Sequence, residues 1–112
     1  MTAYAVAHLH DVDVNAEIVE YLRRIDGTLA PFDGKFIVHG GRQLVAEGPA
    51  NGSVIVIEFP DYAAAQAWYA SPEYQDILPL RTDNAVGVAV LAEHCGDDHV
   101  ATDVLPAALL AD

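Results

Sequence analysis

The stretch from Ser53 to Arg81, SVIVIEFPDYAAAQAWYASPEYQDILPLR, decides the fold of this chain. Its first part, Val54 to Phe59, is a nearly continuous run of β-branched and aromatic residues, which predicts a strand covered on at least one face. Pro60 cannot donate to a sheet ladder, so the strand is expected to end there. The stretch therefore begins with a buried strand and a sharp corner.

Two short helices are predicted to follow this corner. The Asp61 side chain can accept from the free amides of a first helical turn, and the alanines that follow are strong helix formers. Trp68 supplies a large apolar side chain for the core. Ser71-Pro72 ends this helix, because Ser71 can cap a second helix that has Pro72 at its first position.

The segments on either side of this stretch supply the remaining elements. Alternating residues from Tyr4 to His10 predict a first strand, and apolar residues at helical spacing predict a helix from about Ala16 to Pro31. Lys35 to His39 is predicted as a second strand, with Arg42 to Val45 as a candidate continuation beyond a bend at Gly40-Gly41. Residues 85–94, rich in Val and Ala, predict the last strand.

The resulting order is βαββαβ, which is the order of a ferredoxin-like α+β fold. We therefore expect a four-stranded antiparallel sheet with its helices on one face. Such a sheet leaves its other face open, and packing two sheets together would bury that face. The sequence thus predicts a homodimer that forms through its sheets.

The chain resembles the domain-of-unknown-function family numbered 1330, within the dimeric α+β barrel superfamily. The matching pieces, which run from about Tyr4 to about Glu93, are Gly40-Gly41, Glu47-Gly48, Val56–Pro60, Trp68-Tyr69, Ser71–Gln75 and Leu80-Arg81. The resemblance implies the fold and the assembly more than a chemistry. Members of that superfamily include cofactor-free monooxygenases, isomerases and decyclases that act on small oxygenated or aromatic compounds.

Length and charge limit the classes of partner. The 112 residues predict one domain over residues 1–95, and residues 96–112 form a tail that either packs on the partner subunit or is disordered. The formal charge of −12, with five basic residues, argues against nucleic acid and anionic membranes as partners. No apolar run is long enough to span a membrane, and no signal peptide is recognisable. We therefore expect a cytoplasmic protein.

The histidines and the single cysteine do not form a recognisable metal or redox motif. His8 and His10 share one face of the first strand, while His39 and His94 lie on other strands. No compact ligand spacing is present, so the sequence predicts no metal site. Cys95 has no second cysteine with which to form a disulfide, and no nearby base to activate it.

A polar cluster is the better candidate for a functional site. Arg42 and Arg81 are two of only five cations, and an arginine can hold a carboxylate or enolate with two hydrogen bonds. The predicted substrate-binding residues are Arg42, Tyr69, Tyr74, Arg81 and Asn84. A structural alternative remains open, in which Arg81 pairs with Glu47, Glu58 or Glu73 and the tyrosines belong to the core.

His39 and Glu47 are the predicted catalytic residues for proton transfer, since burial could raise the pKa of such a carboxylate towards neutrality. The expected function is a cofactor-independent enzyme of the monooxygenase, isomerase or decyclase type, acting on a small acidic or enolic metabolite. The alternative is a non-catalytic dimeric module that binds or senses a small molecule. The sequence predicts no organic cofactor for either function.

Overall fold

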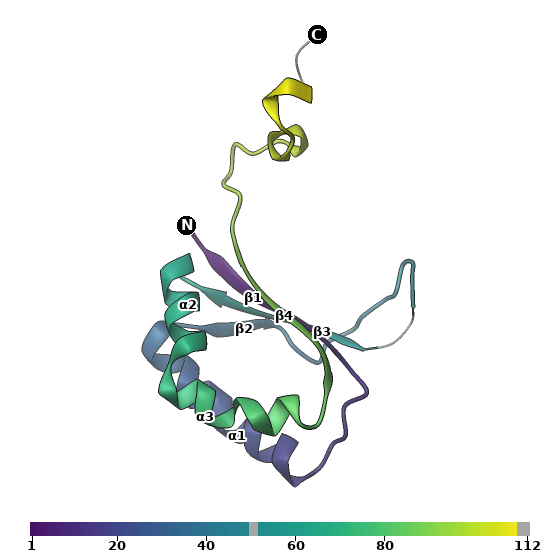
Figure 1. Ribbon diagram of the computed structural model, residues 1–112, viewed down its shortest axis with the longest axis vertical. Helices are drawn as coiled ribbons and strands as arrows, with labels where there is room; N and C mark the ends of the chain where they lie inside the picture. The colour runs from purple at the N-terminus through teal and green to yellow at the C-terminus, as the bar shows by residue number, and fades with distance from the viewer. Residues whose placement is uncertain (50–51, 110–112) are drawn as a thin grey trace.

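A four-stranded antiparallel sheet carries the fold in the computed structural model, which describes residues 1–49 and 52–109. The strands, in the spatial order β2-β3-β1-β4, are β1 (Ala3–His10), β2 (Lys35–Val38), β3 (Ser53–Phe59) and β4 (Val86–Glu93). The α-helices are α1 (Ala16–Leu29), α2 (Tyr62–Ala70) and α3 (Pro72–Thr82), and they cover one face of the sheet (Figure 1). The predicted βαββαβ order and the ferredoxin-like α+β class are confirmed.

Side chains at the helix starts satisfy the first-turn amides, as the sequence predicts. Asp61 Oδ1 accepts from the backbone amide of Ala64 at 2.7 Å. Ser71 Oγ accepts from the amide of Tyr74 at 3.2 Å, so the residue that ends α2 also begins α3. These local hydrogen bonds set the directions of α2 and α3 across the sheet.

The predicted continuation of the second strand over Arg42 to Val45 is wrong. β2 ends at Val38, and Gly40 has a φ of 78° that turns the chain out of the sheet. The Gln43 side chain connects the following loop to the start of β3. It donates to the carbonyl of Gly52 at 3.0 Å and accepts from the amide of Val54 at 2.9 Å. A side chain therefore supplies the contacts that a strand partner would have supplied.

The core lies between the sheet and the helices. Phe59, Leu29 and Ile77 are its largest fully buried side chains. The Trp68 ring lies 5.4 Å from that of Phe59 between centroids, and its Nε1 donates to Thr28 Oγ1 at 3.0 Å. The one polar atom of this aromatic side chain is therefore paired inside the core.

The opposite face of the sheet is apolar and uncovered. Alternation along the strands places Val86, Val88 and Val90 of β4 on this face, and they are 56%, 62% and 54% exposed. Val38 and Val54 add to the same face from β2 and β3. We call these five valines the valine face.

Beyond β4 the chain leaves the body of the domain (Figure 1). The tail contains two short 3₁₀ helices, η2 (Ala101–Val104) and η3 (Ala107–Leu109), with Val104 and Leu109 both at least 70% exposed. The apolar stretch from Leu105 to Leu110 could form a short helix by its sequence, and the structure forms one 3₁₀ turn in it, Ala107–Leu109; residue 110 lies outside the described residues. Packing of this tail on a partner subunit stays a prediction.

Candidate functional site

A cavity of about 560 Å³ lies between the sheet and the helices. Its sheet wall includes Ala5, Ala7, Leu9, Phe36, Ile55, Ile57, Ala89 and Leu91. Ala7 of β1 is paired directly with Ala89 of β4, so two small side chains meet in the middle of this wall. Because neither side chain reaches the helices, the layers are separated by a hollow of the size that small-molecule sites have, roughly 300–1,000 Å³.

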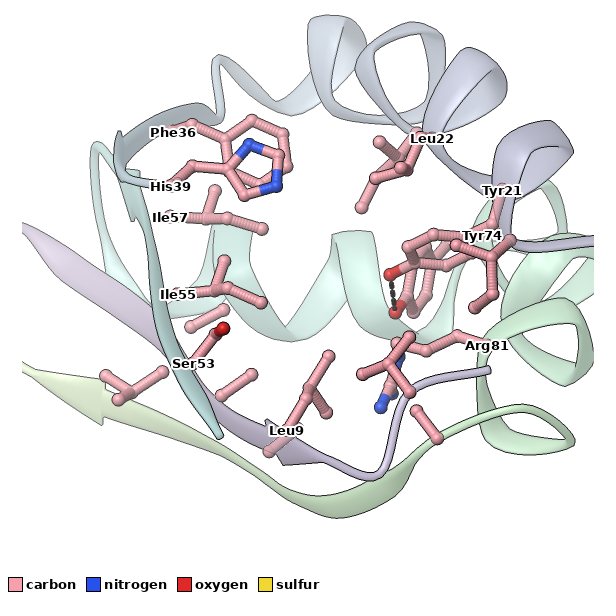
Figure 2. Close-up of a pocket in the computed structure, with 18 of the residues that line it drawn as sticks. Leu9, Tyr21, Leu22, Phe36, His39, Ser53, Ile55, Ile57, Tyr74 and Arg81 are labelled. Atoms are coloured by element: carbon pink, nitrogen blue, oxygen red, sulfur yellow. Dashed lines mark hydrogen bonds between the residues drawn. The ribbon is translucent and has the colours of Figure 1, made fainter. Parts of the chain in front are cut away.

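One end of the cavity is polar. Tyr21 of α1 and Tyr74 of α3 are buried there, with their hydroxyl oxygens 2.9 Å apart. Arg81, two turns beyond Tyr74 on α3, extends its guanidinium into the same end (Figure 2). Residues 60 positions apart in the chain thus form one cluster, which we call the Tyr–Tyr–Arg cluster.

Burial and mutual contact shape the protonation of this cluster. Burial raises the pKa of Tyr21 well above its ordinary value, and Tyr74 raises it further, so this phenol stays protonated. Burial alone would lower the pKa of Arg81, but the oxygens of Tyr74 and Tyr21 outweigh it and leave that pKa raised. The cluster therefore combines a permanently charged guanidinium with the protonated hydroxyl of Tyr21.

Arg81 has no carboxylate partner within the part of the chain that the structure describes. Glu58, one predicted partner, lies 3.5 Å from Lys35 Nζ, while Glu47 and Glu73 are exposed and outside the cavity. Among the described residues, no carboxylate contributes to the raised pKa of Arg81 either. A half-buried cation beside hydroxyl groups is a candidate site for an anion, which would balance its charge.

His39 lies on the opposite side of the cavity (Figure 2). It follows the end of β2, and its ring is stacked on Phe36 with centroids 4.3 Å apart and planes 15° apart. The residue as a whole is exposed. The structure thus places this candidate base in the wall of the cavity, across from the Tyr–Tyr–Arg cluster.

The predicted polar cluster divides into two groups. Tyr69, Tyr74 and Arg81 line the cavity with His39, whereas Arg42 and Glu47 are exposed on the loop between β2 and β3 and do not. The turn at Gly40 carries that loop away from the helices, which is why the predicted grouping of Arg42 and Glu47 with the other residues is wrong.

Asn84 also lies outside the cavity lining and makes structural hydrogen bonds. Its Nδ2 donates to the carbonyl of Leu80 at 2.8 Å and to Glu17 Oε1 at 3.2 Å. Its Oδ1 accepts from Asn15 Nδ2 at 2.6 Å, and Asn15 in turn caps α1. Asn84 therefore connects the end of α3 to the start of α1.

Tyr21 is the member of the cluster that sequence reasoning missed. Its helical spacing with Ile25 and Leu29 identified it only as part of the buried face of α1. The available signal was its hydroxyl, since a phenol on an otherwise aliphatic helix face needs a hydrogen-bond partner once buried.

Within residues 1–49 and 52–109, no group of three or more His, Cys, Asp or Glu side chains is arranged to hold a metal ion. The rings of His8 and His10 lie 6.2 Å apart between centroids, on the face of the sheet away from the cavity. In the same residues, no helix has the length and apolarity needed to cross a membrane.

Fold and cavity together define a ferredoxin-like α+β domain with a hollow between its sheet and helices. The chain belongs to the family described as Domain of unknown function (DUF1330), whose family model matches residues 2–95. The resemblance seen in the sequence is thereby confirmed. Among curated proteins, none matches the chain.

Solved structures share this fold at low sequence identity. One is the RPA0582 protein of unknown function from Rhodopseudomonas palustris, with a TM-score of 0.63, 17% identity, and coverage of 86% of this chain and 84% of that one. Another is SnoaB, a cofactor-independent oxygenase from Streptomyces nogalater, with a TM-score of 0.57, 17% identity, and coverage of 87% of this chain and 96% of that one. A third is a dimeric ferredoxin-like protein of unknown function from Jannaschia sp. CCS1, with a TM-score of 0.57, 17% identity, and coverage of 80% of this chain and 98% of that one. At this identity the likeness concerns the fold alone.

Proposed function

We propose that the protein is a cofactor-independent enzyme that acts on a small acidic or enolic metabolite bound in the cavity. The observation that carries the proposal is the half-buried Arg81, which faces an apolar cavity without a carboxylate partner among the described residues. A carboxylate or enolate oxygen would satisfy it, and the apolar walls would enclose the rest of the molecule.

The proposed chemistry is proton transfer at a carbon next to a carbonyl group. Removing that proton produces an enolate, whose negative oxygen Arg81 would stabilise with the Tyr74 hydroxyl. His39 is the proposed base, since it lines the same cavity and an imidazole nitrogen can accept a proton. Tyr69 would contribute to the binding wall. Glu47 and Arg42 receive no role, because their side chains lie outside the cavity lining.

The fold supports a mechanism without an organic cofactor only by analogy. SnoaB, described as a cofactor-independent oxygenase, has a comparable architecture over 87% of this chain. A shared fold does not transfer a reaction, so the analogy indicates which chemistry is compatible with the scaffold.

A non-catalytic binding module is the second candidate function. It is favoured by the position of His39, which is exposed and lies across the cavity from the Tyr–Tyr–Arg cluster. It is also favoured by the absence of any Asp or Glu from the described lining of the cavity. Such a site would hold an anion without a base beside its reactive carbon.

Phenylpyruvate distinguishes the two functions, because it carries a carboxylate and an enolisable carbon. In deuterated buffer at neutral pH, we expect the dialysed protein to accelerate exchange of the protons on that carbon at least tenfold over buffer, as followed by NMR. His39→Ala should abolish the acceleration, whereas Glu47→Ala, a change outside the cavity, should retain it. Binding without accelerated exchange would support the binding module, and no binding at millimolar phenylpyruvate would contradict both functions.

We further propose that the chain forms a homodimer through the valine face. Solved relatives by fold from Jannaschia sp. CCS1 and Thermobifida fusca are described as dimeric, and a second sheet would remove these exposed valines from water. Val90→Glu would place a charge in that interface, opposite the apolar side chain of Val6.

Light scattering should therefore give twice the chain mass for the wild type and a single chain mass for Val90→Glu at micromolar concentration. Val19→Glu is the matched control, since Val19 is exposed on α1, away from the sheet. It should leave the dimer intact. A wild-type monomer, or a Val90→Glu dimer, would contradict the proposed interface.

A further inference from the structure

The Tyr–Tyr–Arg cluster contains more hydrogen-bond donors than acceptors. A guanidinium has five N–H groups and no acceptor, and each phenol adds one O–H. One of the two O–H protons lies between Tyr21 and Tyr74, whose oxygens are 2.9 Å apart. Among the described residues, no other acceptor is hydrogen-bonded to either hydroxyl, so one O–H remains to be directed at a ligand.

This surplus implies a ligand with more than one oxygen acceptor at the same end. A carboxylate would occupy the planar fork of Arg81 through both of its oxygens. The remaining tyrosine O–H lies next to that fork, because the hydroxyl pair of Tyr21 and Tyr74 lies beside the Arg81 side chain (Figure 2). A further ligand oxygen near the carboxylate would accept a hydrogen bond from this tyrosine O–H.

The rest of the cavity favours a flat molecule. Its walls include the parallel, stacked rings of Phe36 and His39 on one side. The sheet side of the cavity is low and smooth at Ala5, Ala7 and Ala89, because a methyl group projects little from a strand. A planar conjugated frame can lie along such walls with little loss of conformational entropy.

We propose that the cavity binds a planar, conjugated acid that carries its carboxylate and a second oxygen on adjacent carbons of the conjugated frame. The carboxylate pairs with Arg81, and the second oxygen accepts from the Tyr21–Tyr74 hydroxyl pair. The inference rests on the proposed function in one respect, namely that Arg81 receives the anionic group. It adds the position of the second oxygen and assigns Tyr21, together with Tyr74, as the residue that determines this specificity.

Three naphthoates test the inference by isothermal titration calorimetry with the full chain. 1-Hydroxy-2-naphthoate has the two groups on adjacent carbons, 6-hydroxy-2-naphthoate has the same atoms with the hydroxyl remote, and 2-naphthoate lacks the hydroxyl. We expect the first to bind at least tenfold more tightly than the other two. Tyr21→Phe and Tyr74→Phe should each reduce the preference to less than threefold, because each change weakens binding of 1-hydroxy-2-naphthoate more than binding of 2-naphthoate.

Two results would overturn the inference: equal binding of the two hydroxynaphthoates to the wild type, or an unchanged preference in both phenylalanine variants. Thermal unfolding shows whether each variant is folded, and if neither folds, the comparison of the two isomers on the wild type decides alone. Binding of 2-naphthoate without any preference would remove the second-oxygen assignment and leave the anion site standing. The phenylpyruvate experiment decides the proposed function separately.

Discussion

Arg81→Ala is expected to weaken binding of phenylpyruvate about a hundredfold while changing the free energy of unfolding by less than about 1 kcal/mol. The loss in affinity corresponds to roughly 3 kcal/mol, the scale of a charge-assisted hydrogen bond to an ionised group. Stability is spared because the described residues provide no carboxylate that would be left buried without its partner.

This expectation separates two alternatives that the sequence left open. An Arg81 paired with a glutamate would cost about 2–4 kcal/mol of stability on removal, because the partner charge would remain buried. If Arg81 instead faces the cavity without such a partner, its removal should weaken ligand binding and leave the stability of the fold unchanged. Arg81→Lys should restore part of the affinity, since an ammonium retains the charge and loses the planar fork.

Arg24→Ala is the matched control for Arg81→Ala. Arg24 lies on α1 outside the cavity and pairs with Asp76 on the surface at 2.8 Å. Its removal should leave phenylpyruvate binding unchanged. Calorimetry gives the affinities, and urea unfolding at one protein concentration gives the stabilities. An Arg81→Ala variant that binds phenylpyruvate like the wild type would remove Arg81 from the site.

Phe59→Ala is expected to lower the free energy of unfolding by roughly 3–5 kcal/mol, the range for truncating a fully buried aromatic residue. Phe59 is 1% exposed and lies at the end of β3 against Trp68. The neighbouring backbone at Gly34 approaches this ring so closely that an added Cβ would lie 2.7 Å from it. The residues around Phe59 are therefore already closely packed, and they have little freedom to move into the space that the alanine would leave.

Urea unfolding at a fixed protein concentration measures this effect, because any dimer makes stability depend on concentration. Leu44→Ala is the control, since Leu44 is 90% exposed on the loop between β2 and β3. It should change stability by no more than about 0.5 kcal/mol. A Phe59→Ala variant as stable as Leu44→Ala would contradict the assignment of Phe59 to the core.

The arrangement of α2 and α3 was predictable because it depends on neighbours in the chain. The Asp61 and Ser71 caps act over three residues, and Pro60 and Pro72 restrict the backbone wherever they occur. The same holds for Gly40, whose positive φ makes the predicted bend. What followed this bend was not predictable, since Gln43 replaces a strand partner through contacts 9 and 11 residues away.

The candidate site was predictable only in part. Tyr74 and Arg81 lie two turns apart on α3, so their common face followed from the sequence, whereas Tyr69 lies on α2 before the break at Ser71. Arg42 and Glu47 were grouped with them on residue type alone, and residue type carries no information about the direction of a loop. Asn84 has the polarity of a site residue but uses its hydrogen bonds to connect two helices.

The sequence by itself determined the order of elements, the helix boundaries and the excess of acidic surface charge, because these depend on short-range geometry and composition. Only the tertiary structure decided that Ala7 meets Ala89 and leaves a cavity, and that Tyr21 meets Tyr74 beside Arg81. These contacts are between residues 53 to 82 positions apart in the chain. They depend on sheet register and on how α1 packs against α3, which no local pattern specifies.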